Sequence, residues 1–162
     1  MITQIQFYII KRFIMIDIKK TDELTPQELV TIFKERTRVF VVEQTCYYQE
    51  VDDDDYHCFH VRILNDQTNE LMAYARIMPK KDYVTFGRVL VVEKFRKQGL
   101  GNQLLKAVLD YISTHFPDLN VEIEAQAYLT KFYGSFGFKQ TSEVYLLDNI
   151  PHCQMRLTAA NI

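Results

Sequence analysis

The residues most able to do chemistry lie where an aliphatic run gives way to a short basic stretch that contains two glycines. Positions 89–102 read VLVVEKFRKQGLGN. The aliphatic run is typical of a buried strand, and apolar residues recur at helical spacing from Gly99 onward. A helix that starts here leaves main-chain N–H groups without partners and points the positive end of its dipole at the loop. With Arg96 and Lys97 beside it, the stretch predicts a site for a phosphate or pyrophosphate.

The two glycines sharpen this prediction and also limit it. Gly99 and Gly101 remove side chains at the helix start, so a ligand can approach the main chain closely. The chain lacks the Gly-Lys-Ser/Thr of a Walker-type phosphate loop, and two glycines are fewer than a Rossmann fingerprint requires. Nucleotide hydrolysis and dinucleotide redox chemistry are therefore poorly supported. An ordinary helix start with capping glycines and exposed basic side chains is the simpler alternative.

The elements that position this stretch follow from apolar spacing and from turn residues. The sequence Thr25-Pro26-Gln27-Glu28 has the form of a capped helix start. We expect strands at 15–19, 58–65, 70–78, 83–92, 121–125, 138–147 and 153–158, and helices after Thr25, from Gly99 and over 128–136. The strands between 58 and 92 form an antiparallel meander, and the helix from Gly99 completes a parallel βαβ unit. The predicted fold class is α/β: one mixed, mostly antiparallel sheet with helices on both faces.

Composition bounds the class of protein. The 162 residues are 48% hydrophobic and 25% charged, as expected of one globular domain and not of a disordered chain. Lys and Arg number 19 and Asp and Glu 21, and this net charge of −2 argues against a nucleic-acid binder. The three cysteines are widely spaced and form no Cys-x-x-Cys pair, so we expect no disulfides and a cytoplasmic protein. Cys58 lies between two histidines, but the second ligand pair of a zinc site is missing, so no metal is expected.

The segment 1–14 stands apart from the rest of the chain. Its apolar run is shorter than the roughly 20 residues of a membrane span, and its positive charges follow that run instead of preceding it. We therefore expect no membrane association and no secretory signal. Met15 offers a second start, so the segment is interpreted either as an extension upstream of the true start or as a strand or short helix packed on the domain. Residues 15–162 are expected to form the single domain.

Two motifs resemble signatures of the GCN5-related N-acetyltransferase (GNAT) family. Arg96-x-x-Gly99-x-Gly101, placed after an aliphatic strand, is similar to the acetyl-CoA signature of that family. The stretch FYGSFGF at 132–138 is similar to its second signature, a helical Tyr followed by Gly-Phe. Three further stretches are closest to the ElaA-like group of the family: RVFVVEQ (38–44), AYARI (73–77) and IPH (150–152). The resemblance covers about residues 22–158 and implies a GNAT-like acyl-CoA N-acyltransferase fold.

The resemblance implies transfer of an acetyl group from acetyl-CoA to a primary amine, by direct attack in a ternary complex. The acceptor would be a small molecule or a peptide. Within the family the strand at 89–91 splays from its neighbour, so that free main-chain groups pair with the pantetheine amides and one N–H serves the oxyanion. The implied cofactor-binding residues are Val89, Leu90, Val91, Arg96, Lys97, Gln98, Gly99, Leu100, Gly101, Asn102 and Gln126. Gln126 and Leu129 depart from the usual Asn and Ala, and this departure leaves the contact of Gln126 open.

The same resemblance nominates catalytic residues. Tyr133 lies where the family places a tyrosine near the thioester sulfur, so it is the expected general acid, with a merely packed tyrosine as the alternative. Glu43 follows an apolar run and is the first candidate for the general base. His152, in the turn expected between the last two strands, is the second, and Glu124 is a third.

Several features keep alternatives open. A non-catalytic acyl-CoA-binding regulatory module on the same fold would keep the glycine stretch and need no acid. Arg76 and Arg88 either pair with acids inside the domain or bind a substrate carboxylate. The acidic loop 50–55, with the run 52–55, is expected to be solvated, or to steer a cationic acceptor. Aromatic residues in the last third and the exposed edges of the final strands lead us to hypothesise a homodimer.

Overall fold

One sheet organises residues 14–162, the part of the chain that this computed structural model describes. Its eight strands follow the order β1-β2-β3-β4-β5-β8-β6, and β7 pairs with β8. The strands are β1 (Ile14–Lys20), β2 (Phe59–Asn65), β3 (Leu71–Pro79), β4 (Tyr83–Val91), β5 (Asn120–Gln126), β6 (Lys139–Gln140), β7 (Tyr145–Leu147) and β8 (Ile150–Leu157). The α-helices of the described residues are α1 (Pro26–Arg36), α2 (Leu100–His115) and α3 (Thr130–Gly134).

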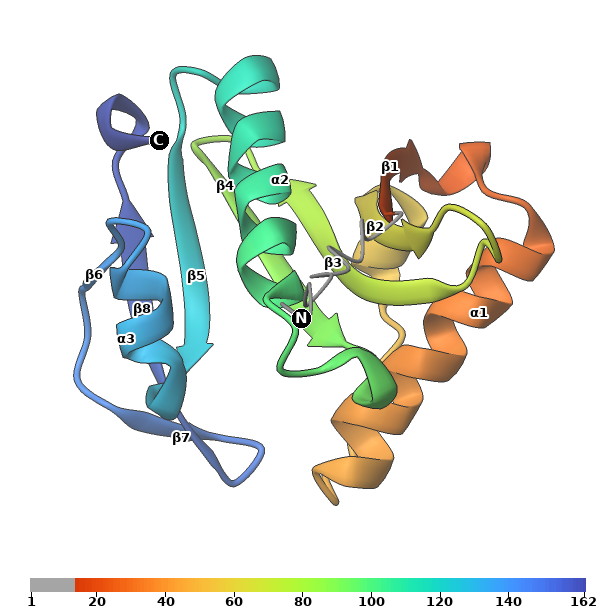
Figure 1. Ribbon diagram of the computed structural model, residues 1–162. Helices are drawn as coiled ribbons and strands as arrows, with labels where there is room; N and C mark the ends of the chain where they lie inside the picture. The colour runs from red at the N-terminus through yellow and green to blue at the C-terminus, as the bar shows by residue number, and fades with distance from the viewer. Residues whose placement is uncertain (1–13) are drawn as a thin grey trace, which may run out of the picture.

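The pairing directions confirm the predicted mixed sheet. The pairs β1–β2, β2–β3 and β3–β4 are antiparallel, β4 and β5 are parallel, and β5 and β8 are antiparallel. Helix α2 makes the crossover between the two parallel strands, as the sequence predicts. In Figure 1, β2 and β3 lie between α1 and α2, so helices cover both faces of this half of the sheet.

Each face of the sheet has its own apolar core. On one face, Leu104 and Val108 of α2 are fully buried against strands β2 to β5. On the other face, Ile32 of α1 packs in a cluster with Tyr74 and Leu90. Successive side chains of a strand point to opposite faces, so β3 and β4 contribute to both cores. Full burial of each Leu or Ile contributes about 1.5–3 kcal/mol, and the two cores together fix α1 and α2 relative to β4.

Helix α1 begins at the capping box that the sequence predicts. Thr25 N donates to the Glu28 carboxylate at 2.8 Å, and Glu28 N donates to Thr25 Oγ1 at 3.2 Å, with Pro26 as the first helical residue. Beyond Arg36 the chain continues as a π-helical segment, Thr37–Glu43. This segment carries Glu43 to the rim of the cavity described below.

The last third of the chain departs from the predicted elements. The strand expected over 138–147 is divided into β6 and β7, which both pair with β8. Between them the ladder breaks, because the main-chain N–H of Gln154 donates to the hydroxyl of Ser142 (2.9 Å) and not to a strand carbonyl. The helix expected over 128–136 is a 3-10 turn, Ala127–Leu129, followed by the short α3.

The turn before β8 also differs from the prediction. Asp148 and Asn149 form it, with φ of +50° and +63°, and β8 begins directly afterwards at Ile150. His152 therefore lies in a strand and not in the turn expected for it.

Two predictions concern the N-terminal segment and membranes. Residues 1–13 lie outside the described residues, so the division into a segment 1–14 and a domain 15–162 stays a prediction. No helix within 14–162 is long and apolar enough to cross a membrane.

Candidate active site

Strands β4 and β5 separate soon after they meet, and a cavity lies between them. Their parallel pairing consists of Tyr83 with Asn120 and Val84 with Val121. Beyond Val84 the two strands line opposite sides of a cavity of about 780 Å³. Main-chain groups of β4 that face this gap have no β5 partner, so they are available to pair with the amides of an extended ligand.

A bulge in β4 lies beside the same cavity. Tyr74 pairs with Leu90 and Arg76 with Gly87, so β4 holds one more residue than β3 across this interval. Arg88 has a φ of +54°, in the left-handed region. A bulge of this kind redirects the main chain of the residues that follow it. The region 89–91, expected to supply the oxyanion donor, is therefore turned relative to the rest of the strand.

The side chains of 89–91 pack largely against the two cores, although all three residues line the cavity. Leu90 is buried in the core beneath α1, whereas Val89 and Val91 are half-buried against the core beneath α2. The prediction that these residues bind the cofactor therefore concerns mainly their N–H and C=O groups.

The basic glycine stretch lies next to the cavity and reaches its lining through Arg96. A 3-10 turn, Glu93–Phe95, leads from β4 to Arg96 and Lys97, which are exposed. Gly99 caps α2 with a φ of +79°, which a side chain rarely adopts. A Cβ placed on Gly99 would meet no atom within 4 Å, so any side chain there would enter open space.

The remaining residues of the predicted cofactor loop have different surroundings. Leu100 is buried in the core, so only its main chain can serve a ligand. Asn102 is exposed in the first turn of α2, and Gln98 Nε2 donates to the Lys94 carbonyl at 3.4 Å. Gly101 has ordinary space: a Cβ there would lie 3.9 Å from the Phe132 ring.

Arg96 connects the glycine stretch to the π-helical segment. Its Nε donates to the Val91 carbonyl at 3.0 Å, and its Nη2 donates to Glu43 Oε2 at 2.7 Å. Glu43, the first candidate for the base, thus lines the cavity as one partner of an exposed ion pair. The pair connects the stretch 93–99 to the end of the π-helical segment Thr37–Glu43.

Tyr133 lies on α3 and lines the cavity from the face covered by α2. It is buried, and its ring packs against Phe86, Phe132 and Phe138 with centroid separations of 6.2, 5.2 and 6.0 Å. Burial raises the pKa of the Tyr133 hydroxyl to about 12. The hydroxyl is therefore protonated at neutral pH.

The opposite face of the sheet presents a second set of polar side chains. Gln126 pairs with His152 across β5 and β8, and Tyr145 of β7 pairs with His152 from the other side. Since alternate residues share a face, Glu124 lies on the same face as Gln126. All of these except Tyr145 line the cavity. Gln126 Nε2 donates to Gln44 Oε1 at 3.4 Å.

Two hydrogen bonds define what this second set can do. His152 Nδ1 lies 2.7 Å from the Ile150 carbonyl. Because a carbonyl only accepts, Nδ1 carries the proton, and in the neutral ring Nε2 keeps a free lone pair. The Tyr145 hydroxyl donates to Glu124 Oε1 at 2.8 Å, which fixes that carboxylate by a neutral partner.

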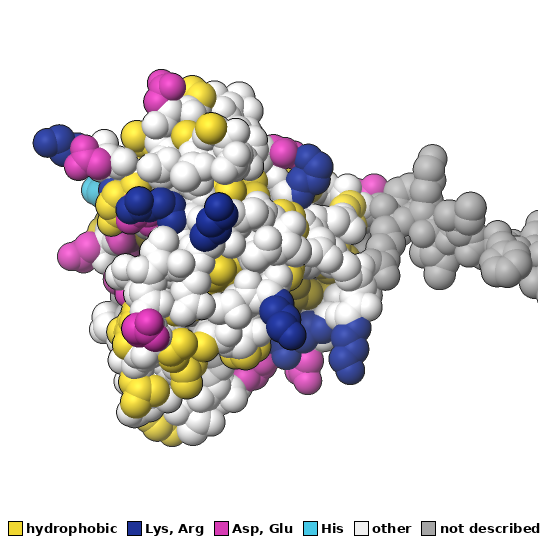
Figure 2. All heavy atoms as spheres, turned by 90° about the vertical axis from the view of Figure 1, so that its left-hand side faces the viewer, with side chains coloured by type: hydrophobic (Ala, Val, Ile, Leu, Met, Phe, Trp, Pro, Cys, Tyr) yellow, Lys and Arg dark blue, Asp and Glu magenta, His cyan; other side chains and the backbone are white. Residues whose placement is uncertain are grey.

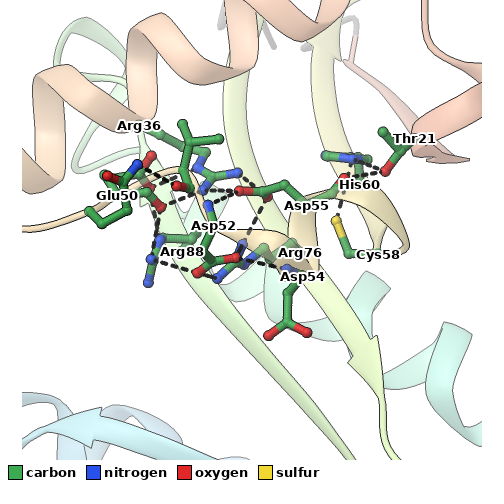
Figure 3. A network of polar contacts seen from close by, with 12 residues as sticks. Thr21, Arg36, Glu50, Asp52, Asp54, Asp55, Cys58, His60, Arg76 and Arg88 are labelled. Atoms are coloured by element: carbon green, nitrogen blue, oxygen red, sulfur yellow. Dashed lines mark hydrogen bonds and ion pairs between the residues drawn. The ribbon is translucent and has the colours of Figure 1, made fainter.

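A largely buried network of charged side chains lies beside the cavity (Figure 3), and some of its members line that cavity. Arg36 bonds to Asp55 through two nitrogens, at 2.6 and 3.0 Å, and to Glu50 at 2.8 Å. Arg88 Nε donates to the same Glu50 oxygen at 2.8 Å. Arg76 holds both carboxylate oxygens of Asp52 at 2.6 Å. The network joins α1, the segment 50–55 and strands β3 and β4.

This network corrects one expectation and decides another. The run 52–55 is not a solvated loop: Asp53–Tyr56 forms a 3-10 turn, and Asp52, Asp54 and Asp55 are in ion pairs. Burial by itself would raise the pKa of Asp55, but the hydrogen bonds from Arg36 outweigh it and lower that pKa to about 2. Arg76 and Arg88 pair with acids, as one of the two interpretations has it.

Cys58 and His60 belong to a buried polar cluster with Thr21 and Tyr74, and Tyr74 packs on the face of the sheet that α1 covers. His60 Nδ1 lies 2.8 Å from the Tyr74 hydroxyl, and its Nε2 lies 3.0 Å from Thr21 Oγ1 and 3.4 Å from Cys58 Sγ. Burial lowers the pKa of His60 to about 4, so the ring is neutral at pH 7. Within 14–162 no three His, Cys, Asp or Glu side chains are grouped so that they could hold a metal ion.

The sequence did not reveal the contribution of Tyr145 or of Gln44. Tyr145 acts through Glu124 from a strand that the sequence pattern merged with its neighbour, and Gln44 contacts Gln126 from a segment 82 positions away. The stretch 38–44 and the Ile150-Pro151-His152 triplet were the signals available for these two segments.

A cleft between two diverging parallel strands, with a glycine-capped helix following the first of them, is the arrangement of an acyl-CoA-dependent N-acyltransferase of the GNAT type. The family model of the acetyltransferase (GNAT) domain matches residues 20–159. The chain belongs to this family, and within it to the ElaA-like group. It is 43% identical to protein ElaA of Escherichia coli (strain K12) over 136 residues, which are 82% of this chain and 89% of that protein.

Solved structures agree with this placement. An acyl-CoA N-acyltransferase from Pseudomonas aeruginosa is 39% identical, with a TM-score of 0.83 over 88% of this chain and 98% of the other. The crystal structure of Escherichia coli ElaA is 38% identical, also with a TM-score of 0.83, over 88% of this chain and 98% of the other. The predicted family, group and fold class are thereby confirmed.

Proposed function

We propose that this protein transfers an acetyl group from acetyl-CoA to a primary amine, by direct attack of the amine on the thioester in a ternary complex. The observation that carries the proposal is the cavity between β4 and β5. Two chemically different sets of residues line it: the edge of β4 with Arg96, and the polar side chains of Glu124, Gln126 and His152. A donor and an acceptor could therefore reach the bulge of β4 from different sides.

The donor side offers main-chain recognition. The first N–H groups of α2, with Arg96 and Lys97 beside them, are suited to the pyrophosphate of CoA. The unpaired edge of β4 is suited to the pantetheine amides, and Gln126 lies at the end of β5 where its amide can contact the same chain. The main-chain N–H groups of 89–91 are the proposed donors to the oxyanion.

The acceptor side offers a base, and Tyr133 offers an acid. We assign the base to His152, because its Nδ1–H is engaged by the Ile150 carbonyl and its Nε2 lone pair is free to accept a proton from the amine. Glu43 stays a prediction as an alternative base, held by Arg96. Attack by the neutral amine forms the C–N bond, the oxyanion collapses, and the departing thiolate takes the proton of Tyr133.

A screen that detects free thiol tests this proposal. Acetyl-CoA is incubated with the protein and a panel of amines, and thiol release is compared with that from propionyl-CoA and from longer acyl-CoA thioesters. We expect release that depends on both protein and amine and is fastest with the acetyl donor. Binding of acetyl-CoA without amine-dependent release from any panel member would favour the non-catalytic acyl-CoA-binding module.

We also propose that the protein is cytoplasmic and forms a homodimer. The segment around β7 exposes apolar side chains: Val144, Leu146 and Leu147 are 54%, 70% and 38% exposed. Figure 2 faces the edge formed by β6 and β8 and shows hydrophobic side chains gathered in its lower part, at the level of β7. Sedimentation at tens of micromolar protein should show a dimer, and a monomer alone would contradict this proposal.

A further inference from the structure

The arginines of the cavity are already engaged by carboxylates. Arg96 is paired with Glu43. Arg76 and Arg88 belong to the buried network of Figure 3. There Arg76 is paired with Asp52, and Arg88 is paired with Glu50 and Asp52. An acceptor that carries a carboxylate would therefore have to displace an ion pair to reach any of these cations, and such a displacement removes much of what it gains.

The acids of the cavity are not all engaged in this way. Glu43, Asp52 and Asp54 each have a cation within ion-pair distance, the last from Lys80. Glu124 lines the cavity and is exposed, and among the described residues its one side-chain contact is the hydrogen bond from the Tyr145 hydroxyl. That bond orients the carboxylate and leaves its negative charge uncompensated.

Glu124 is also in the right place for an acceptor. It shares a face of the sheet with Gln126 and His152, and this face is opposite to the one from which Tyr133 lines the cavity. Asp148, exposed in the turn before β8, also lines the cavity and has no side-chain partner within 14–162. The acceptor side thus carries excess negative charge beside the proposed base.

We infer that the acceptor is an amine with a second cationic group, such as a diamine, and that Glu124, held by Tyr145, binds that second cation. This inference rests on the proposed function and names its substrate class. A charge-assisted hydrogen bond between the Glu124 carboxylate and an ammonium group would add affinity for a diamine over a monoamine. The same charge disfavours an amino acid, whose carboxylate would face Glu124 without a free cation to receive it.

A four-carbon series isolates the second group: diaminobutane, butylamine and γ-aminobutanoate carry a cation, a methyl group and a carboxylate at the far end. Binding of each is measured by titration calorimetry with the protein saturated in CoA, so that the readout does not depend on acetyl transfer. The wild type should bind diaminobutane about tenfold more tightly than butylamine, and γ-aminobutanoate most weakly. Glu124→Gln should bind the first two equally, and Tyr145→Phe should lose part of the preference.

Glu122→Gln is the matched control, because Glu122 lies two residues away on the same strand and face, is paired with Arg156 and does not line the cavity. It should keep the full preference. The inference is overturned if the wild type binds butylamine as tightly as diaminobutane, if it favours γ-aminobutanoate, if none of the three binds, or if Glu124→Gln keeps the preference. Tight diamine binding without thiol release would contradict acetyl transfer and support the inference. Equal turnover of diamine and monoamine would support acetyl transfer and contradict the inference.

Discussion

The two sides of the cleft are built from different parts of the chain. The donor side consists of consecutive residues, 89–102, and offers mostly main-chain groups at a strand edge and a helix start. The proposed acceptor side consists of side chains from the π-helical segment, the segment 44–55 and strands β3, β5 and β8, and long-range ion pairs and hydrogen bonds hold it in place. A donor shared by a family can be recognised by main chain, whereas discrimination among acceptors requires side-chain charge, which each sequence can vary.

The largest effect is expected at the residue between the two sides. Tyr133→Phe keeps the ring that packs on Phe86 and Phe138 and removes only the hydroxyl. A positioned acid is worth about 10²–10⁴-fold in rate, so kcat should fall by about that factor while the affinity for acetyl-CoA stays the same. Steady-state kinetics with the acceptor found in the screen measures both quantities.

Tyr111→Phe is the control for this variant, since Tyr111 lies on α2 outside the cavity and should keep wild-type kinetics. Unchanged kcat in Tyr133→Phe would remove the acid assignment. Weaker acetyl-CoA binding with unchanged kcat would make Tyr133 a cofactor contact instead.

The ion-pair network beside the acceptor side should also contribute strongly to the free energy of unfolding. Arg36→Met leaves Glu50 and Asp55 buried without their main cation, a loss of about 3–5 kcal/mol in the free energy of unfolding. Arg156→Met, which breaks the exposed pair with Glu122, should lose at most about 1 kcal/mol. Urea titrations of both variants test the contrast, and equal losses would mean that the network does not hold this side together.

A smaller effect is expected from pH, through His60 behind the acceptor side. Burial lowers the folded-state pKa of His60 from 6.5 to about 4, so the unfolded chain binds the proton first. Stability should therefore fall as the pH decreases from about 6.5 to 4.5, by about 2 kcal/mol. Asp55 and Glu28, with pKa values lowered to about 2, lose their contributions only below their ordinary values of 3.8 and 4.5.

Urea unfolding at several pH values between 6.5 and 4.5 isolates the histidine. The His60→Gln variant should show a flatter dependence in that window. A wild-type unfolding free energy that is constant over the window would show that His60 is not held neutral by the fold.

The sequence predicted the donor side better than the acceptor side for a physical reason. Gly99, Gly101 and Tyr133, whose roles stay predictions, lie within local strand–loop–helix units, whose apolar spacing and glycines are visible in the sequence. The pair of Arg96 and Glu43 spans 53 positions and depends on a π-helical segment that apolar spacing does not distinguish from an α-helix.

The acceptor side also contains turns and pairs without a compositional signal. The turn at Asp148 and Asn149 has two residues with positive φ but neither Gly nor Pro, so the sequence pattern placed the turn too late and His152 within it. The acids of 52–55 look solvated until the fold brings Arg36, Arg76 and Lys80 against them.

The most direct test of the account is calorimetric titration of acetyl-CoA into the wild type and Gly99→Val. Gly99 has a φ of +79° and open space beside it, so valine both strains the start of α2 and projects into the space that a donor would occupy. Gly134→Ala is the control, because a Cβ there also meets nothing within 4 Å and its φ is ordinary. We expect binding by the wild type and by Gly134→Ala, and no binding by Gly99→Val. A wild type that does not bind acetyl-CoA, or a Gly99→Val variant that binds it equally well, would contradict it.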